Sequence, residues 1–249
     1  MAPIVFSLGY RCSSAGVLKR LNQKTESYPF DWLVSRLPIV EHCMETDFQE
    51  FLNPDNYEEL RTNTYHYATP HSDPQWICEE RIQWNRHYST IPNSHLYIPS
   101  YLSKERDAYA YPFLINHKNI ADPIDHEYYK RCVARWRNMM QSPEAKRGLY
   151  IHPVLNTEEY TPISVELLDE IRRFHGSVAI PHFHGIYVFP VRTDTESPIE
   201  TIYQEGTITV AVLWTNRDFI DAGEIFMGNH GAEEAHLCEW IHHKIHEHA

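Results

Sequence analysis

Cys12 is the residue with the most direct potential for chemistry in this sequence. It follows a short apolar run at 3–9 and opens a segment, 13–21, in which apolar residues recur at helical spacing. The dipole of a helix favours the thiolate form of a cysteine at the N-terminus, and the neighbouring Arg11 adds a positive charge. The spacing therefore predicts either a cysteine nucleophile or a small residue that packs the turn.

The same turn contains Gly9, Tyr10 and Arg11, and we expect it to bind an anion. The first amides of a helix have no intrahelical partner, and with the dipole they attract negative charge. Ser13 or Ser14 can cap this helix. The letters G-Y-R-C match neither a Walker motif nor a dinucleotide-binding glycine pattern, so the turn indicates an anion without specifying a nucleotide class.

Arg131 and Arg135 are a second candidate for anion binding. They fall one turn apart on a helix expected over 126–141. Two guanidinium groups at this spacing can clamp a diphosphate from one side while the amides of the first turn meet it from the other. The alternative is that both arginines lie on a solvated helix surface.

Two histidine pairs have spacings that could supply two metal ligands each. His182 and His184 would share one face of a strand, and His242 and His246 would share one face of a helix. An H-E-x-x-H zinc motif is absent from the sequence, and the C-terminal histidines resemble a polar surface helix. We therefore expect no functional metal and no cofactor.

Composition excludes several classes of protein. The 249 residues include 22 Lys and Arg against 34 Asp and Glu, a net charge of −12 that repels nucleic acid. No apolar run approaches the roughly 20 residues that span a bilayer, and the first nine residues do not resemble a signal peptide. Five cysteines without a C-x-x-C pair favour reduced thiols. We expect a folded cytoplasmic protein and leave its oligomeric state open.

The elements that must position these residues follow a β-α-β order. Apart from the first strand and helix, we expect helices at 38–52, 126–141, 164–175 and from 232 onward, and strands at 148–152, 177–180, 185–189 and 207–214. This order predicts one Rossmann-like α/β domain over 1–249, with a largely parallel sheet flanked by helices. Region 53–122 has weak periodicity and is expected to be an irregular Tyr- and His-rich insertion or cleft wall.

Aromatic residues make up 13% of the chain, and many lie in this weakly periodic region. Ring faces stack on sugars, and tyrosine hydroxyl groups bond to sugar hydroxyls. Core packing is the other explanation. Asp194 and Glu196 have the carboxylate spacing that holds a metal-bound nucleotide sugar in some transferases, although their polar surroundings favour an exposed loop. The aromatic residues considered are Tyr65, Tyr67, Trp76, Trp84, Tyr88, Tyr97, Tyr101, Tyr109 and Tyr111.

Three stretches carry a family resemblance: Ser7-Leu-Gly-x-x-Cys12, the segment 27–33 with its Pro-Phe-Asp-Trp-Leu sequence, and Arg131-x-x-x-Arg135-Trp136. They resemble a domain family of unknown function that is catalogued as papain-like cysteine peptidases and also occurs among enzymes that build glycans and capsules. The resemblance implies a hydrolase in which Cys12 is the nucleophile, His117 the base and Asp31 its orienting group. The usual C-G-x-C-W setting of a papain nucleophile is absent.

Taken together, these features lead us to expect a glycosyltransferase-like enzyme that needs no metal. The first turn and the arginine pair would bind a nucleotide-sugar donor, and His117 or Asp31 would deprotonate a hydroxyl group of a glycan or protein acceptor. One alternative is a cysteine hydrolase that uses Cys12 and His117. The other is a glycan-binding module without catalytic activity.

Overall fold

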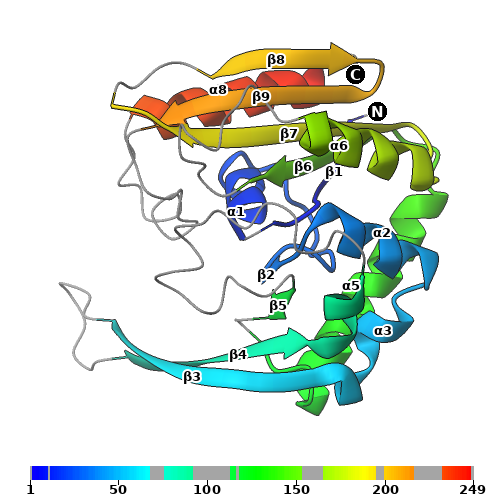
Figure 1. The fold of residues 1–249 in the computed structure, drawn as a ribbon, viewed down its shortest axis with the longest axis vertical. Helices are drawn as coiled ribbons and strands as arrows, with labels where there is room; N and C mark the ends of the chain where they lie inside the picture. Colours follow the sequence, from blue (N-terminus) through cyan, green and yellow to red (C-terminus); the bar gives the residue numbers. More distant parts are fainter. Residues whose placement is uncertain are drawn as a thin grey trace.

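The computed structural model describes residues 2–10, 12–67, 76–91, 113–115, 118–152, 165–194, 199–215 and 232–247. Within these ranges the side chains of 60–67, 76–82, 114, 165–166 and 232–234 are not described. The described residues form two sheets, with helices packed on the larger one (Figure 1).

The larger sheet has five strands in the order β1-β6-β7-β9-β8. Its first four strands are parallel to one another, and β8 pairs antiparallel with β9 at one edge. The expected fold class, a largely parallel sheet flanked by helices, is therefore confirmed. The strands are β1 (Ile4–Ser7), β6 (Lys146–Ile151), β7 (Phe183–Arg192), β8 (Glu200–Glu205) and β9 (Ile208–Thr215).

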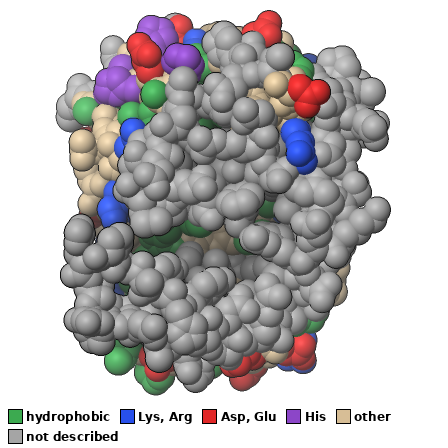
Figure 2. Space-filling view, turned by 90° about the vertical axis from the view of Figure 1, so that its left-hand side faces the viewer, with side chains coloured by type: hydrophobic (Ala, Val, Ile, Leu, Met, Phe, Trp, Pro, Cys, Tyr) green, Lys and Arg blue, Asp and Glu red, His purple; other side chains and the backbone are tan. Residues whose placement is uncertain are grey.

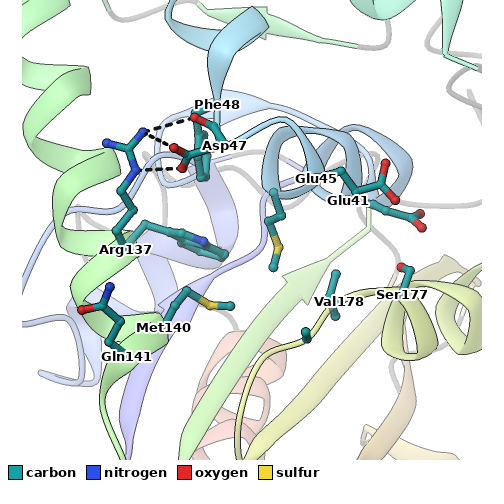
Figure 3. A pocket seen from close by; sticks show the side chains of 12 residues that line it. Glu41, Glu45, Asp47, Phe48, Arg137, Met140, Gln141, Ser177 and Val178 are labelled. Carbon is teal, nitrogen blue, oxygen red and sulfur yellow. Dashed lines mark hydrogen bonds and ion pairs between the residues drawn. The ribbon is translucent and has the colours of Figure 1, made fainter.

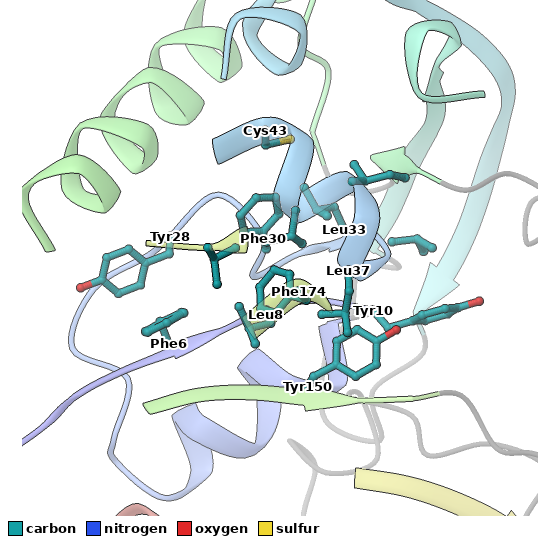
Figure 4. Close-up of a cluster of buried hydrophobic side chains, with 14 of the residues drawn as sticks. Phe6, Leu8, Tyr10, Tyr28, Phe30, Leu33, Leu37, Cys43, Tyr150 and Phe174 are labelled. Atoms are coloured by element: carbon teal, nitrogen blue, oxygen red, sulfur yellow. The ribbon is translucent and has the colours of Figure 1, made fainter. Parts of the chain in front are cut away.

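Side chains alternate between the two faces of this sheet, and each face is buried. On one face Val5, Leu149 and Ile186 pack with α1 (Cys12–Arg20) and α8 (Ala232–His246). The opposite face packs with α2 (Leu37–Glu45), α5 (Pro123–Gln141) and α6 (Val165–Ser177). Figure 4 shows part of this second cluster. Burial of both faces explains why β1, β7 and β9 are mostly apolar, whereas the edge strand β8 is largely exposed and polar.

A second, four-stranded antiparallel sheet has the order β2-β5-β4-β3. Its two long strands, β3 (Tyr57–Tyr67) and β4 (Trp76–Asn85), lie inside the region expected to be irregular, and weak periodicity did not predict them. The short strands β2 (Leu33–Val34) and β5 (Leu114–Ile115) join this hairpin to the rest of the chain. The short helices are α3 (Gln49–Leu52), η1 (Pro54–Asn56) and η2 (Arg86–Thr90).

Two expected elements differ from the structure. The strand at 177–180 was predicted wrongly, because α6 runs to Ser177 and residues 178–180 form a loop into β7. Val178 and Ile180 are buried there while Ala179 is exposed. This alternation of buried and exposed residues is the pattern expected of a strand. The helix expected at 38–52 is divided into α2 and α3. Of the three residues between them, Asp47 and Phe48 have left-handed backbone φ values of 49° and 63°.

Gly9 provides a test of the turn between β1 and α1. Its φ is 89°, and a Cβ atom at this position would collide with Oγ of Ser35. We expect Gly206→Ala, at a φ of 55° with open space around it, to cost about 1–2 kcal/mol of unfolding free energy. Gly9→Ala should cost clearly more, because it adds the collision. Urea denaturation followed by circular dichroism measures both values, and equal losses would contradict the close approach of Gly9 and Ser35.

Candidate functional site

Cys12 is the first residue of α1 and is half-buried. The turn before it is held from two sides. The Gly9 amide donates to Oγ of Ser7 at 3.0 Å, and the Ser35 amide donates to the carbonyl oxygen of Tyr10 at 3.1 Å. Since α1 follows β1 directly, its N-terminus lies at the carboxyl edge of the parallel strands, where α/β proteins commonly bind ligands.

Ser14 links this turn to the neighbouring strand. Its side chain is completely buried, and its hydroxyl group donates to the carbonyl oxygen of Gly9 at 2.8 Å and accepts a bond from the Ile151 amide at 3.0 Å. The hydroxyl therefore joins the turn to the end of β6, a different role from the helix cap that the sequence suggested. Cys12 and the residue after Ile151 are thus brought to the same edge of the sheet.

That next residue, His152, was not predicted as a site residue. It is buried, its amide donates to the Val188 carbonyl oxygen at 2.8 Å, and its ring centroid lies 5.2 Å from the ring of Tyr10 and 5.2 Å from that of Phe189. A signal for it existed in the sequence. The expected strand at 148–152 ends in histidine, and the carboxyl end of a parallel strand is where functional side chains gather.

Buried charge lies close to this edge of the sheet. The guanidinium group of Arg36, which is 2% exposed, lies 5.9 Å from the ring centroid of Tyr10. Tyr150 packs edge-on against the same ring, with the centroids 6.2 Å apart. On α6, burial raises the pKa of Glu170 to about 7, while the positive charges of Arg173 and Arg36 oppose that rise. A buried carboxyl group with a pKa of about 7 therefore lies within electrostatic range of Arg36 and Tyr150.

The other cysteines with described side chains are unsuited to chemistry. Cys43, Cys132 and Cys238 are buried. Burial raises the pKa of Cys43 to about 12, and it also raises the pKa of Cys132. Among the cysteines whose side chains the structure describes, Cys12 alone is more than slightly exposed.

Asp31 and Arg135 lie near the opposite end of α1 from Cys12. A hollow of about 500 Å³ is lined there by Lys19, Lys24 and Arg135. Lys24 donates to the buried carboxylate of Asp31 at 2.5 Å, and Arg135 donates to the Ser27 carbonyl oxygen at 3.3 Å. Because α1 has nine residues, its length of about 13 Å separates this hollow from the first turn.

The other residues predicted to form the site either lie away from Cys12 or fall outside the described residues. Arg131 lies exposed on α5, one turn before Arg135. His117 and Arg11 fall outside the described residues. Burial raises the pKa of Asp31 to about 6 against the effect of the Lys24 ammonium group, and the Tyr28 amide donates to the same carboxylate at 2.7 Å. The structure thus groups Asp31 with Arg135, away from Cys12.

The histidine pairs have different outcomes. His182 lies in the turn before β7, whereas His184 is buried with Nε2 at 2.8 Å from the Thr209 hydroxyl oxygen, so the expected shared strand face is wrong. His242 and His246 do share a face of α8, with ring centroids 4.6 Å apart. Figure 2 shows histidine side chains gathered near its upper edge. Across the described ranges, no three His, Cys, Asp or Glu side chains are grouped to hold a metal.

The aromatic and carboxylate candidates are described only in part. Tyr88 is completely buried in the core, and Trp84 is half-buried at the end of β4. Asp194 is exposed, and Glu196 lies outside the described residues. The side chains of the other aromatic candidates also lie outside them: Tyr65, Tyr67, Trp76, Tyr97, Tyr101, Tyr109 and Tyr111.

A separate pocket of about 440 Å³ lies between α2, α5 and the end of α6 (Figure 3). Arg137 closes part of its wall by donating to both carboxylate oxygens of Asp47, at 2.8 and 2.9 Å. Ser177 and Val178, which also line it, precede β7. The pocket is therefore at the amino edge of the sheet, opposite the edge that carries Cys12.

Glu170 gives a pH prediction. Its pKa is about 7 in the folded protein, above the ordinary value of 4.5, so the folded state holds this proton more tightly than the unfolded state does. The stabilisation from Glu170 is complete below about pH 4.5 and is lost as the pH rises through 7. Glu170→Gln should therefore gain stability relative to the parent protein between pH 5 and 8, as measured by thermal denaturation. A constant difference over that range would contradict the raised pKa.

Comparison of the chain with known proteins identifies one matching family model. Neither the curated proteins nor the solved structures yield a match to the chain. None of the described helices is long and apolar enough to cross a membrane. The family model described as "Putative papain-like cysteine peptidase (DUF1796)" matches residues 4–180, which is more than half of the chain and includes both Cys12 and His152. On this match over β1, α1 and β6, the chain belongs to the DUF1796 family.

Proposed function

We propose that this protein is a cysteine-dependent hydrolase of peptide or related acyl bonds, with Cys12 as its nucleophile. The observation that carries the proposal is the position of Cys12, a partly exposed thiol on the first residue of α1 at the carboxyl edge of the sheet. Membership of a family described as papain-like cysteine peptidases supports the same chemistry. A thiolate at a helix N-terminus is the form that attacks a carbonyl carbon.

The surrounding residues supply the other parts of the reaction. The Cys12 thiol loses its proton to a base, and its sulfur attacks the substrate carbonyl carbon. The first-turn amides of α1 then stabilise the negative oxygen. The base returns the proton to the leaving amine or alcohol, which leaves a thioester on Cys12. Water attacks this thioester, releases the acid and restores the thiol.

We assign the base to His152, with His117 as the alternative that the family resemblance implies. His152 follows Ile151, whose amide is bonded to Ser14, two residues after Cys12. Its ring packs against Tyr10, two residues before Cys12. Tyr10 and Ser14, which lie two residues before and two residues after Cys12, thus both contact the segment that contains His152. Its burial between Tyr10 and Phe189 limits the orientations of the ring.

Cys12→Ala should abolish the hydrolysis of fluorogenic peptide libraries and of p-nitrophenyl esters. His152→Ala should lower kcat by about 10²–10⁴-fold, since that is the usual contribution of a general base. The matched control is His126→Ala, because the His126 ring contacts the Leu52 carbonyl oxygen at 2.9 Å, away from this turn. Turnover that survives Cys12→Ala would refute the proposal. If His117→Ala reduces the rate and His152→Ala does not, the base is His117.

A nucleotide-sugar transferase is the second proposal, and one observation favours it. The hollow at the end of α1 combines three cations, Lys19, Lys24 and Arg135, with the rings of Trp32 and Tyr128. This combination suits an anionic ligand that carries a sugar. Nevertheless, the donor phosphates would have to bind at this end of the helix, about 13 Å from the amides of the first turn.

Thermal-shift measurements with UDP-, GDP- and dTDP-sugars distinguish the two proposals, since a ligand that binds only the folded state raises the melting temperature. The transferase proposal predicts a shift that Arg135→Ala removes and Cys12→Ser leaves intact. The hydrolase proposal predicts no nucleotide-dependent shift and rapid alkylation of Cys12 by iodoacetamide, located by mass spectrometry. Binding of glycans without turnover or nucleotide dependence would favour a glycan-binding module over both.

A further inference from the structure

We propose that His42 and His87 form a binding site for a transition-metal ion of the Zn²⁺, Ni²⁺ and Cu²⁺ class. His42 lies on α2, and His87 lies on η2 just after β4. The folded chain brings their Nε2 atoms to 3.5 Å from each other. This pair is separate from the turn that contains Cys12 and independent of the proposed hydrolysis.

The separation of the two nitrogens fits a shared metal ion. Two imidazole nitrogens that bind one tetrahedral ion at about 2.0–2.1 Å are about 3.3–3.4 Å apart. A direct hydrogen bond between two nitrogens is ordinarily shorter than the 3.5 Å observed. The rings are tilted by 42° with their centroids 5.1 Å apart, and their Nε2 atoms face each other at 3.5 Å.

Glu50 places a carboxylate near His87, at the distance of an ion pair and without a direct hydrogen bond. Its Oε2 lies 3.7 Å from Nδ1 of His87, the ring nitrogen turned away from His42. The side-chain nitrogen of Asn56 donates to the same Oε2 at 2.7 Å and so orients the carboxylate. A carboxylate close to the distal nitrogen favours a proton there, and that tautomer leaves Nε2 free to bind a metal.

The backbone around this pair is also fixed. Asn85 is completely buried, and its side-chain oxygen accepts a bond from the His87 amide at 3.0 Å while its side-chain nitrogen donates to the Glu50 carbonyl oxygen at 2.9 Å. The buried ring of Tyr88 packs edge-on against both histidines, with centroids 5.9 and 5.8 Å away. The two imidazole rings are therefore positioned before any ion arrives.

The ion would have two protein ligands. The described residues contain no group of three possible ligands, so water would complete the coordination, and both rings are only half-buried. Imidazole ligands favour Zn²⁺, Ni²⁺ and Cu²⁺ over Mg²⁺ or Ca²⁺. Since α2 packs on the five-stranded sheet and η2 follows the hairpin, the ion would link the two sheets.

The test must first remove the histidine pair on α8, which could bind the same ions. In the full-length His242→Ala/His246→Ala protein, competition against a chromophoric chelator should detect one equivalent of bound Zn²⁺. Adding either His42→Ala or His87→Ala should weaken that binding at least tenfold, and Glu50→Gln should weaken it by about tenfold. The control His243→Ala, a further exposed histidine of α8, should have no effect.

Electron paramagnetic resonance of the Cu²⁺ form supplies a second readout, in which we expect hyperfine coupling to two nitrogens in the parent and to fewer in the His87→Ala protein. Circular dichroism without metal verifies that each variant is folded. If His42→Ala does not fold, His87→Gln on the half-exposed turn gives the same comparison. Unchanged Zn²⁺ affinity in a folded His87 variant, or no bound equivalent in the parent, would overturn the proposal. Neither result depends on whether Cys12 is catalytic.

Discussion

The hydroxyl group of Ser14 makes two hydrogen bonds on which the geometry of the first turn depends. It holds the carbonyl oxygen of Gly9 and the amide of Ile151 within the core, where water could not replace either partner. The left-handed conformation of Gly9 and its close approach to Ser35 fix the other side of the turn. Among the described residues, the position of Cys12 relative to His152 therefore follows from contacts among three chain segments.

Local patterns were sufficient to predict much of the larger sheet and its helices. The apolar run at 3–9 and the helical spacing after it correspond to β1 and α1. In the helix expected over 126–141, Tyr129, Val133 and Trp136 are buried as their spacing requires, and Asp122 caps its first turn. These features depend on neighbours within one or two turns, which is the range that periodicity reports. Cys12 at a helix start was predictable for the same reason.

Contacts between distant segments were not predictable from these patterns. The Nε2 atoms of His42 and His87 meet although 45 residues separate them, and His152 meets Tyr10 across two strands. The break between α2 and α3 coincides with Asp47, which Arg137 of α5 holds by a two-point contact. Strand β8 has mostly exposed side chains and therefore lacks the apolar signal of a central strand. Such features depend on the register and packing of the complete fold.

The larger sheet includes strands that lie beyond the residues matched by the family model. The family match ends at residue 180, before β7, yet β6 pairs with β1 on one side and with β7 on the other. A chain cut at 180 would leave β6 with an open edge and would uncover Val5 and Leu149, which pack against residues of β7, β9 and α8. The stretch that the family model matches is therefore shorter than the stretch that must fold together.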